Sequence, residues 1–273
     1  MESFKPSHNY NHSLQLFHGS MLNIMGTRFE ILIVDQSESL CVSVWTQVVS
    51  ELRFLQQMFN RFDPLSEISI INNEAYSKPI KASPEMWTVL QNCRKYYELT
   101  LGLFDITLND FSKIEFLEES KSISFSCHTT KIDFGGYAKG YALNKIKNIL
   151  IEHYVSNCFV DFGNSSILAM GKHPHGDSWK VSIENPFDTN QILAEVELYN
   201  KALSVSGNTP SYSGHIIRPD SMEYMVEPKL VCIASENPED VEVLTTSYII
   251  ANNNEKNKLT ANIKNDKILE FNL

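Results

Sequence analysis

The segment Asp133–Gly140, with the sequence Asp-Phe-Gly-Gly-Tyr-Ala-Lys-Gly, predicts a strand that turns sharply into a helix. We expect the strand from Lys131 to Phe134 and the helix from Ala138 to about His153. The glycines permit a tight turn and a close backbone approach, and the unpaired N–H groups of the helix start, with Lys139, can face an anion. A plain turn with a surface lysine is the alternative, and the spacing matches neither a Walker nor a Rossmann motif.

Further helices are predicted on both sides of this segment. Apolar residues recur at helical spacing from Val44 to Phe59 and form one buried stripe. Ser83-Pro84-Glu85 combines an N-cap, a first-turn proline and an acid, so it opens a helix to about Leu99 that Gly102 closes. Asn237-Pro238-Glu239 opens a last helix through about Ala251 by the same logic.

Strands dominate the second half of the chain. Arg28–Val34 is an early strand, and short apolar or alternating runs follow from Asn157 onward. The chain should close with a hairpin of Leu259–Ile263 and Lys267–Phe271. The sequence therefore predicts an α+β fold of largely antiparallel sheets flanked by helices, with a polar N-terminal tail over residues 1–20 and one domain over residues 21–273.

Composition excludes several classes of protein. The chain has 273 residues, a formal net charge of −10 and a pI near 5.3, so we expect no nucleic acid partner. Its 5 cysteines form no C-x-x-C pair, which favours buried reduced thiols over a zinc site or a disulfide framework. The N-terminal residues resemble neither a signal peptide nor a membrane anchor, so the chain as given is expected in the cytoplasm, or exported if a leader was removed.

Two constellations outside the glycine turn suggest chemistry. Glu242, Thr245 and Thr246 share one face of the last helix and can ligate a hard cation such as Mg²⁺, although such a face is usually only solvated. His215 precedes an apolar pair and can accept a proton from a hydroxyl near neutral pH, although a histidine at a strand edge is the usual reading. Gly102–Thr107, taken alone, is a helix end and a turn.

Taken together and in order, these segments resemble the FAD:protein FMN transferase (ApbE-type) family. The resemblance begins near Met21 and covers nearly all of the remaining chain. Its matching segments are Met25-Gly26-Thr27, Arg61-Phe62-Asp63-Pro64, Ser66–Ser69 with Asn72, Gly102–Thr107, Asp133–Gly140, Val160–Gly163, Trp179–Pro186, Ser204–Gly207, His215–Pro219 and Glu242–Thr246.

The resemblance implies an α+β enzyme that binds FAD and Mg²⁺, splits the pyrophosphate and transfers FMN to a threonine or serine hydroxyl of a target protein, with release of AMP. It implies His215 as the base and Lys139 as a stabiliser of the pyrophosphate. The implied flavin-nucleotide contacts are Met25, Phe62, Leu103, Phe104, Asp105, Asp133, Lys139 and Ile217. The implied metal ligands are the Gly136 carbonyl, Glu242, Thr245 and Thr246.

The chain departs from the family pattern at several positions. Glu242 and Arg218 each replace an aspartate, Asn164 replaces a second glycine, and Ser221-Met222 replaces Thr-Gly. Three hypotheses follow: the transferase, an FAD pyrophosphatase that uses water and releases FMN and AMP, and a catalytically silent FAD-binding protein.

Overall fold

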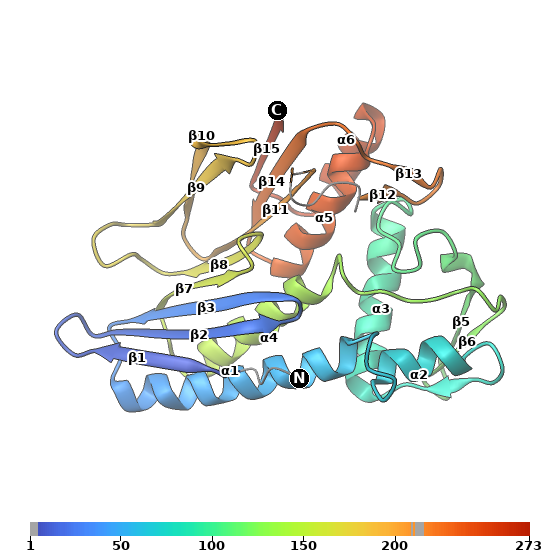
Figure 1. Cartoon of the computed structure of the whole chain (residues 1–273), viewed down its shortest axis with the longest axis horizontal. Coiled ribbons are helices and arrows are strands. Elements are labelled where there is room, and N and C mark those ends of the chain that lie inside the picture. The colour runs from blue at the N-terminus through green and yellow to red at the C-terminus, as the bar shows by residue number, and fades with distance from the viewer. Residues whose placement is uncertain (1–4, 209, 211–215) are drawn as a thin grey trace.

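The computed structural model describes residues 5–208, 210 and 216–273 (Figure 1). The helices are α1 Glu38–Phe59, α2 Glu67–Glu74, α3 Pro84–Leu99, the 3-10 turn η1 Phe111–Lys113, α4 Ala138–Glu152, α5 Pro238–Ile250 and α6 Asn253–Asn262. The strands are β1 Ser7–Asn11, β2 Leu16–Ile24, β3 Thr27–Val34, β4 Ile80–Lys81, β5 Ile114–Leu117, β6 Ser122–Phe125, β7 Asn157–Phe162, β8 Ser166–Met170, β9 Trp179–Asn185, β10 Asp188–Leu198, β11 Lys201–Gly207, β12 Ile217–Arg218, β13 Glu223–Tyr224, β14 Lys229–Ser235 and β15 Lys267–Asn272.

One large sheet organises the molecule. Its 8 strands run in the order β1-β2-β3-β7-β8-β11-β14-β15, and each neighbouring pair is antiparallel. Smaller antiparallel sheets are formed by β4-β6-β5, β9-β10 and β12-β13. The predicted α+β class with largely antiparallel sheets is confirmed.

Both faces of the large sheet are buried in its central strands, whereas β1 and β2 keep one exposed face. In β14, Val231 and Ile233 join the main core, whereas Leu230, Cys232 and Ala234 join a second cluster with the β9–β10 hairpin. The helices α1, α4 and α5 cover the first face, and β9–β10 covers the second (Figure 1). The candidate site lies on the helical side, where α4 meets α5.

Residues 7–20 differ from the polar tail that we expected. They form β1 and most of β2, and the hairpin extends the large sheet beyond β3. Phe17 is fully buried there, and its ring packs near Trp45 of α1. A few apolar residues on one face suffice because the backbone pairing with β3 supplies the rest of the stabilisation.

The predicted helix signals are confirmed. Ser83 caps α3 by accepting a hydrogen bond from the Met86 N–H, and Asn237 caps α5 in the same manner through the Glu239 N–H. The helix predicted from Val44 begins earlier, at Glu38, because Ser37 caps it. At the end of α3, Gly102 has a φ of +81°, which glycine adopts without strain.

Two predicted strands are wrong. Lys131–Phe134 is extended but belongs to no sheet, since the side chain of Asn72 both accepts from the Ile132 N–H at 2.7 Å and donates to its carbonyl at 2.9 Å. An amide side chain thus replaces a neighbouring strand. Leu259–Ile263 lies largely in α6, which starts at a capping box formed by Asn252 and Glu255, and β15 pairs with β14 instead.

The described cysteines are all free, and only Cys127 is not buried. Over the described ranges, no helix is both long and apolar enough to span a bilayer.

Candidate functional site

The start of α4 packs closely against the first turns of α5. A side chain at Gly140 would lie 2.7 Å from the Glu242 Cβ and 2.8 Å from the Pro238 carbonyl oxygen, so only glycine allows this approach. The close contact brings Lys139, one residue earlier in α4, to Glu242. No side chain caps the N-terminus of α4 at Tyr137, but the Ala138 N–H donates to the Phe134 carbonyl at 2.8 Å, which leaves the next N–H groups, those of Lys139 and Gly140, to face an anion.

The carboxylate of Glu242 is buried and has three polar partners. The Lys139 ammonium lies 2.5 Å from Oε1, and the side chains of Lys139 and Glu242 are 21% and 6% exposed. The Ser166 hydroxyl donates to Oε2 at 2.7 Å and the Ser204 hydroxyl donates to it at 3.2 Å. Ser166 and Ser204 are register partners in β8 and β11, so the large sheet holds both hydroxyls under α5.

The oxygen donors at this place suit a hard cation. Thr245 and Thr246 follow Glu242 on α5 and donate their hydroxyl hydrogens to the carbonyls of Val241 and Glu242, at 2.5 and 3.3 Å, which leaves lone pairs for a cation. The Lys139 ammonium lies against the Glu242 carboxylate, in the position that a metal cation would take. In the described part of the chain, no three His, Cys, Asp or Glu side chains form a metal cluster. These few ligands fit Mg²⁺, which commonly keeps waters and substrate phosphates in its shell, better than a fully protein-ligated ion.

Asp133 connects the glycine turn to two other segments. Its Oδ2 pairs with Arg61 at 3.0 Å, and its Oδ1 accepts from the Gly135 N–H at 2.9 Å. Its own N–H donates to the Ile106 carbonyl at 2.7 Å. The Arg61 guanidinium in turn lies 4.9 Å from the ring centre of Phe62, a side chain that is 83% exposed.

The predicted Leu103–Asp105 contacts lie beside the same turn. Leu103 and Phe104 are both buried, and the Phe104 ring would be 3.9 Å from a side-chain carbon at Gly136. The Asp105 carboxylate accepts from the backbone N–H of Thr107 at 2.7 Å and from its hydroxyl at 2.6 Å. Burial raises the pKa of the Asp105 carboxyl above its usual range, although these hydrogen bonds oppose the shift.

Met25 lies in the β2–β3 turn, near the end of the sheet that carries Ser166. Its N–H donates to the Gln56 side chain of α1 at 2.8 Å. Next to this turn, Gly163 approaches Thr27 so closely that an added Cβ would lie 2.5 Å from the Thr27 hydroxyl. Asn164, which replaces a family glycine, has a φ of +61°, a conformation that asparagine tolerates. It also accepts a hydrogen bond from Arg28.

Ile217 lies in the small hairpin β12–β13, at the far end of α5 from Glu242. Arg218 holds this hairpin by donating to the Ile250 carbonyl at 2.8 Å and by pairing with Glu255 at 2.7 Å and Asp220 at 2.7 Å. The aspartate-to-arginine departure thus has a structural role. His215, predicted as the base, lies outside the described residues.

Arg218→Met should destabilise the protein more at neutral pH than in acid. Hydrogen bonds from Arg218 lower the pKa of both the Glu255 and the Asp220 carboxyls. Carboxyls with lowered folded-state pKa values stabilise the fold above their unfolded values, about 4.3 and 3.9, and lose that contribution as the pH falls through the folded values. Urea unfolding at pH 7 and pH 3 measures the difference, and an equal wild-type advantage at both pH values would contradict it.

The sequence did not single out Ser166, Ser204 or the role of Arg61. Ser166 is the first residue of β8 and Ser204 lies within β11, in the segment Ser204–Gly207 that resembles the family, but only the strand register shows that the two serines meet at Glu242. Arg61 was matched as part of a loop, and its pairing with Asp133 spans 72 residues, the difference between positions 133 and 61.

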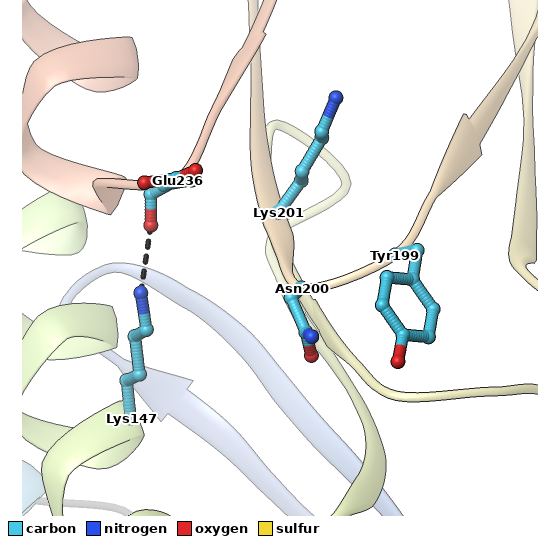
Figure 2. A pocket seen from close by; sticks show the side chains of 5 residues that line it. All are labelled: Lys147, Tyr199, Asn200, Lys201 and Glu236. Carbon is cyan, nitrogen blue, oxygen red and sulfur yellow. Dashed lines mark hydrogen bonds between the residues drawn. The ribbon is translucent and has the colours of Figure 1, made fainter.

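A separate hollow of about 390 Å³ lies away from these residues. Figure 2 shows its lining side chains, which are Lys147, Tyr199, Asn200, Lys201 and Glu236. Lys147 donates to the Glu236 carbonyl at 2.8 Å, and Lys201 pairs with Asp266 at 3.5 Å. None of the predicted site residues lines it, so we assign it no role.

Comparisons with known proteins agree with the sequence motifs. The model of the ApbE family matches residues 25–121 and 109–269. A curated FAD:protein FMN transferase of Chlamydia muridarum (strain MoPn / Nigg) is 29% identical over 182 residues, which are 56% of this chain and 55% of that protein. The FAD:protein FMN transferase of Chlamydia pneumoniae is 25% identical over 182 residues, which are again 56% of this chain and 55% of that protein. The chain spans about half the length of the curated relatives it matches.

Solved structures share the fold. The flavin transferase ApbE from Vibrio cholerae superposes with a TM-score of 0.77 at 18% identity, over 98% of this chain and 97% of that chain. The ApbE protein from Thermotoga maritima gives a TM-score of 0.76 at 17% identity, over 98% and 96%. At such identities the likeness establishes the fold.

Proposed function

Because the chain belongs to the ApbE family, we propose that it is an FAD:protein FMN transferase. It binds FAD, splits the pyrophosphate, transfers FMN to a threonine or serine hydroxyl of a target protein and releases AMP. The names of the curated relatives support this activity. The observation that carries the proposal is the pairing of Lys139 with buried Glu242 at the uncapped N-terminus of α4.

This arrangement suits a diphosphate. The N–H groups of a helix start and a nearby lysine bind phosphate oxygens, and fixed positive charge stabilises the charge that develops in phosphoryl transfer. Mg²⁺ would be held by Glu242, Thr245, Thr246 and the Gly136 carbonyl and would neutralise the non-bridging oxygens. His215 accepts the proton of the acceptor hydroxyl in this proposal.

The flavin side of FAD would meet the segments around Asp133. Asp133 offers a carboxylate for a ribose or flavin donor, and Phe62 and Ile217 offer apolar contacts at the edges. Leu103 and Phe104 would form the wall beside Gly136, and Met25 would add a contact from the β2–β3 turn. The described hydrogen bonds between Asp133, Gly135 and Ile106 fix the wall and the glycine turn relative to each other.

Asp133→Asn should weaken FAD binding about tenfold and change stability little. The asparagine oxygen still accepts from Gly135, but the charge and the Arg61 pair are lost, and an exposed ion pair contributes at most about 1 kcal/mol. Titration of FAD fluorescence measures the affinity. Asp188→Asn is the matched control, because Asp188 accepts from the Asn190 N–H in a distant turn. Equal loss in both variants would contradict the role of Asp133.

The activity is tested by incubating the purified chain with FAD and a protein extract of the organism that it comes from. One sample contains Mg²⁺ and the other contains EDTA. We expect AMP and, in equal amount, flavin that remains on a protein after denaturing electrophoresis, only with Mg²⁺. AMP with free FMN in the absence of extract would identify a pyrophosphatase instead. FAD that is bound but recovered intact under every condition would identify a silent flavin-binding protein.

A further inference from the structure

The Glu242 carboxylate is fully engaged before any ligand arrives. One of its oxygens contacts the Lys139 ammonium, and the other accepts from Ser166 and Ser204. The other buried carboxylate on α5, Glu239, faces Tyr137, Asn92 and Asn144 and does not share this cation, and Asp240 accepts from the Tyr96 hydroxyl. The Lys139–Glu242 pair is therefore a neutral unit enclosed between α4, α5 and the large sheet.

We propose that Lys139 is a resident counter-cation that a divalent metal ion must displace from Glu242. An ammonium group and a divalent ion on the same carboxylate oxygen repel one another, so the presence of either at Oε1 opposes binding of the other. Oε2 is the poorer alternative because two serine hydroxyls from β8 and β11 already donate to it. The metal ion therefore binds to the Glu242 carboxylate as the Lys139 ammonium leaves it, in a single exchange. The choice of a divalent metal ion as the ligand of this site rests on the proposed function.

The displaced ammonium has a defined destination. Lys139 lies in the first turn of α4 on a flexible four-carbon stem, and its side chain is 21% exposed. The backbone N–H groups of Lys139 and Gly140, which follow the engaged Ala138 N–H in this first turn, attract an anion. Lys139 therefore neutralises Glu242 when the site is empty and turns to the diphosphate once a metal replaces it. By linkage, the metal and FAD strengthen each other's binding through this lysine.

The test is the affinity for Mn²⁺ without FAD, measured from the free-ion electron paramagnetic resonance signal. The proposal expects Lys139→Met to bind Mn²⁺ about tenfold more tightly than the wild type. Lys139→Gln should do the same, which keeps the test decisive if one variant does not fold. The Mn²⁺ that Glu242→Gln still binds measures binding of this ion to other acidic side chains of the protein. Lys145→Met is the matched control, because Lys145 is on the same helix but pairs with Glu85 and Glu51.

Either of two results would overturn the exchange. The first is that both Lys139 variants bind Mn²⁺ no more tightly than the wild type. The second is that Glu242→Gln binds Mn²⁺ as tightly as the wild type, which would mean that the ion is bound elsewhere. Failure of the proposed function can be distinguished from failure of the exchange. If only the proposed function failed, the Lys139 variants would still gain Mn²⁺ affinity, but the wild type would release no AMP from FAD.

Discussion

Glu242→Gln is expected to lower AMP release from FAD at least 100-fold. Removing one preorganised electrostatic group from a transfer site costs about 10²–10³ in rate, and under the proposed function the amide would also bind the metal poorly. The glutamine can keep the hydrogen bonds from Ser166 and Ser204, so the fold should persist. Chromatographic quantification of AMP over time, with circular dichroism to check folding, measures the effect.

Glu236→Gln is the matched control for this variant. Glu236 lies just before the same helix, and its side chain is 64% exposed and paired with Lys264 at 3.0 Å. Its loss should leave AMP release unchanged. If Glu242→Gln released AMP at the wild-type rate while remaining folded, the buried carboxylate would have no part in the reaction.

Gly140→Ala is expected to have the largest effect on stability near the site. The new Cβ would collide with the Glu242 Cβ at 2.7 Å and with the Pro238 carbonyl oxygen at 2.8 Å, both on or beside a helix that cannot yield locally. Overpacking of this kind costs about 1–3 kcal/mol and outweighs the better helix propensity of alanine, which is about 1 kcal/mol. The separation of α4 and α5 should also pull Lys139 from Glu242 and weaken FAD turnover.

Urea unfolding and AMP release measure these two consequences. Gly176→Ala serves as the control, since a Cβ there would come no closer than 3.7 Å to its nearest contact, the Ser178 carbonyl oxygen. A Gly140→Ala protein as stable as the control would mean that α4 and α5 are not packed as described.

Local signals in the sequence were sufficient for the helices around the site. Ser83-Pro84 and Asn237-Pro238 combine a cap with a proline that fits only a first helical turn, and the structure uses both. The glycine turn before α4 was predictable for the same reason, because its conformation is encoded within a few residues. Several strands of the second half were predictable from short apolar runs, because strands that are buried on both faces, such as β8 and β14, are apolar almost throughout.

The sequence was insufficient where distant residues decide the conformation. Residues 7–20 appear polar because the hairpin has an exposed face, and only its pairing with β3 makes it a strand. Asn72 satisfies Ile132 across 60 residues, which no local pattern encodes. The Lys139–Glu242 pair, 103 residues apart, likewise depends on how α4 crosses α5 at Gly140.

The departures from the family pattern can now be interpreted from their contacts. Arg218 holds the β12–β13 hairpin through Glu255 and Asp220, and Asn164 occupies a left-handed position that asparagine tolerates. Arg218 therefore stabilises the framework around the site, and Asn164 fits the turn that the family forms with glycine. Glu242 is the departure that bears on chemistry, because its longer side chain reaches Lys139 and two serines.

The most direct measurement is AMP release from FAD by the purified chain in a host protein extract, with Mg²⁺ and with EDTA. The proposed transferase predicts AMP in the Mg²⁺ sample, an equal amount of flavin bound covalently to protein, and neither product with EDTA. Intact FAD in the Mg²⁺ sample, with no flavin on any protein, would contradict it.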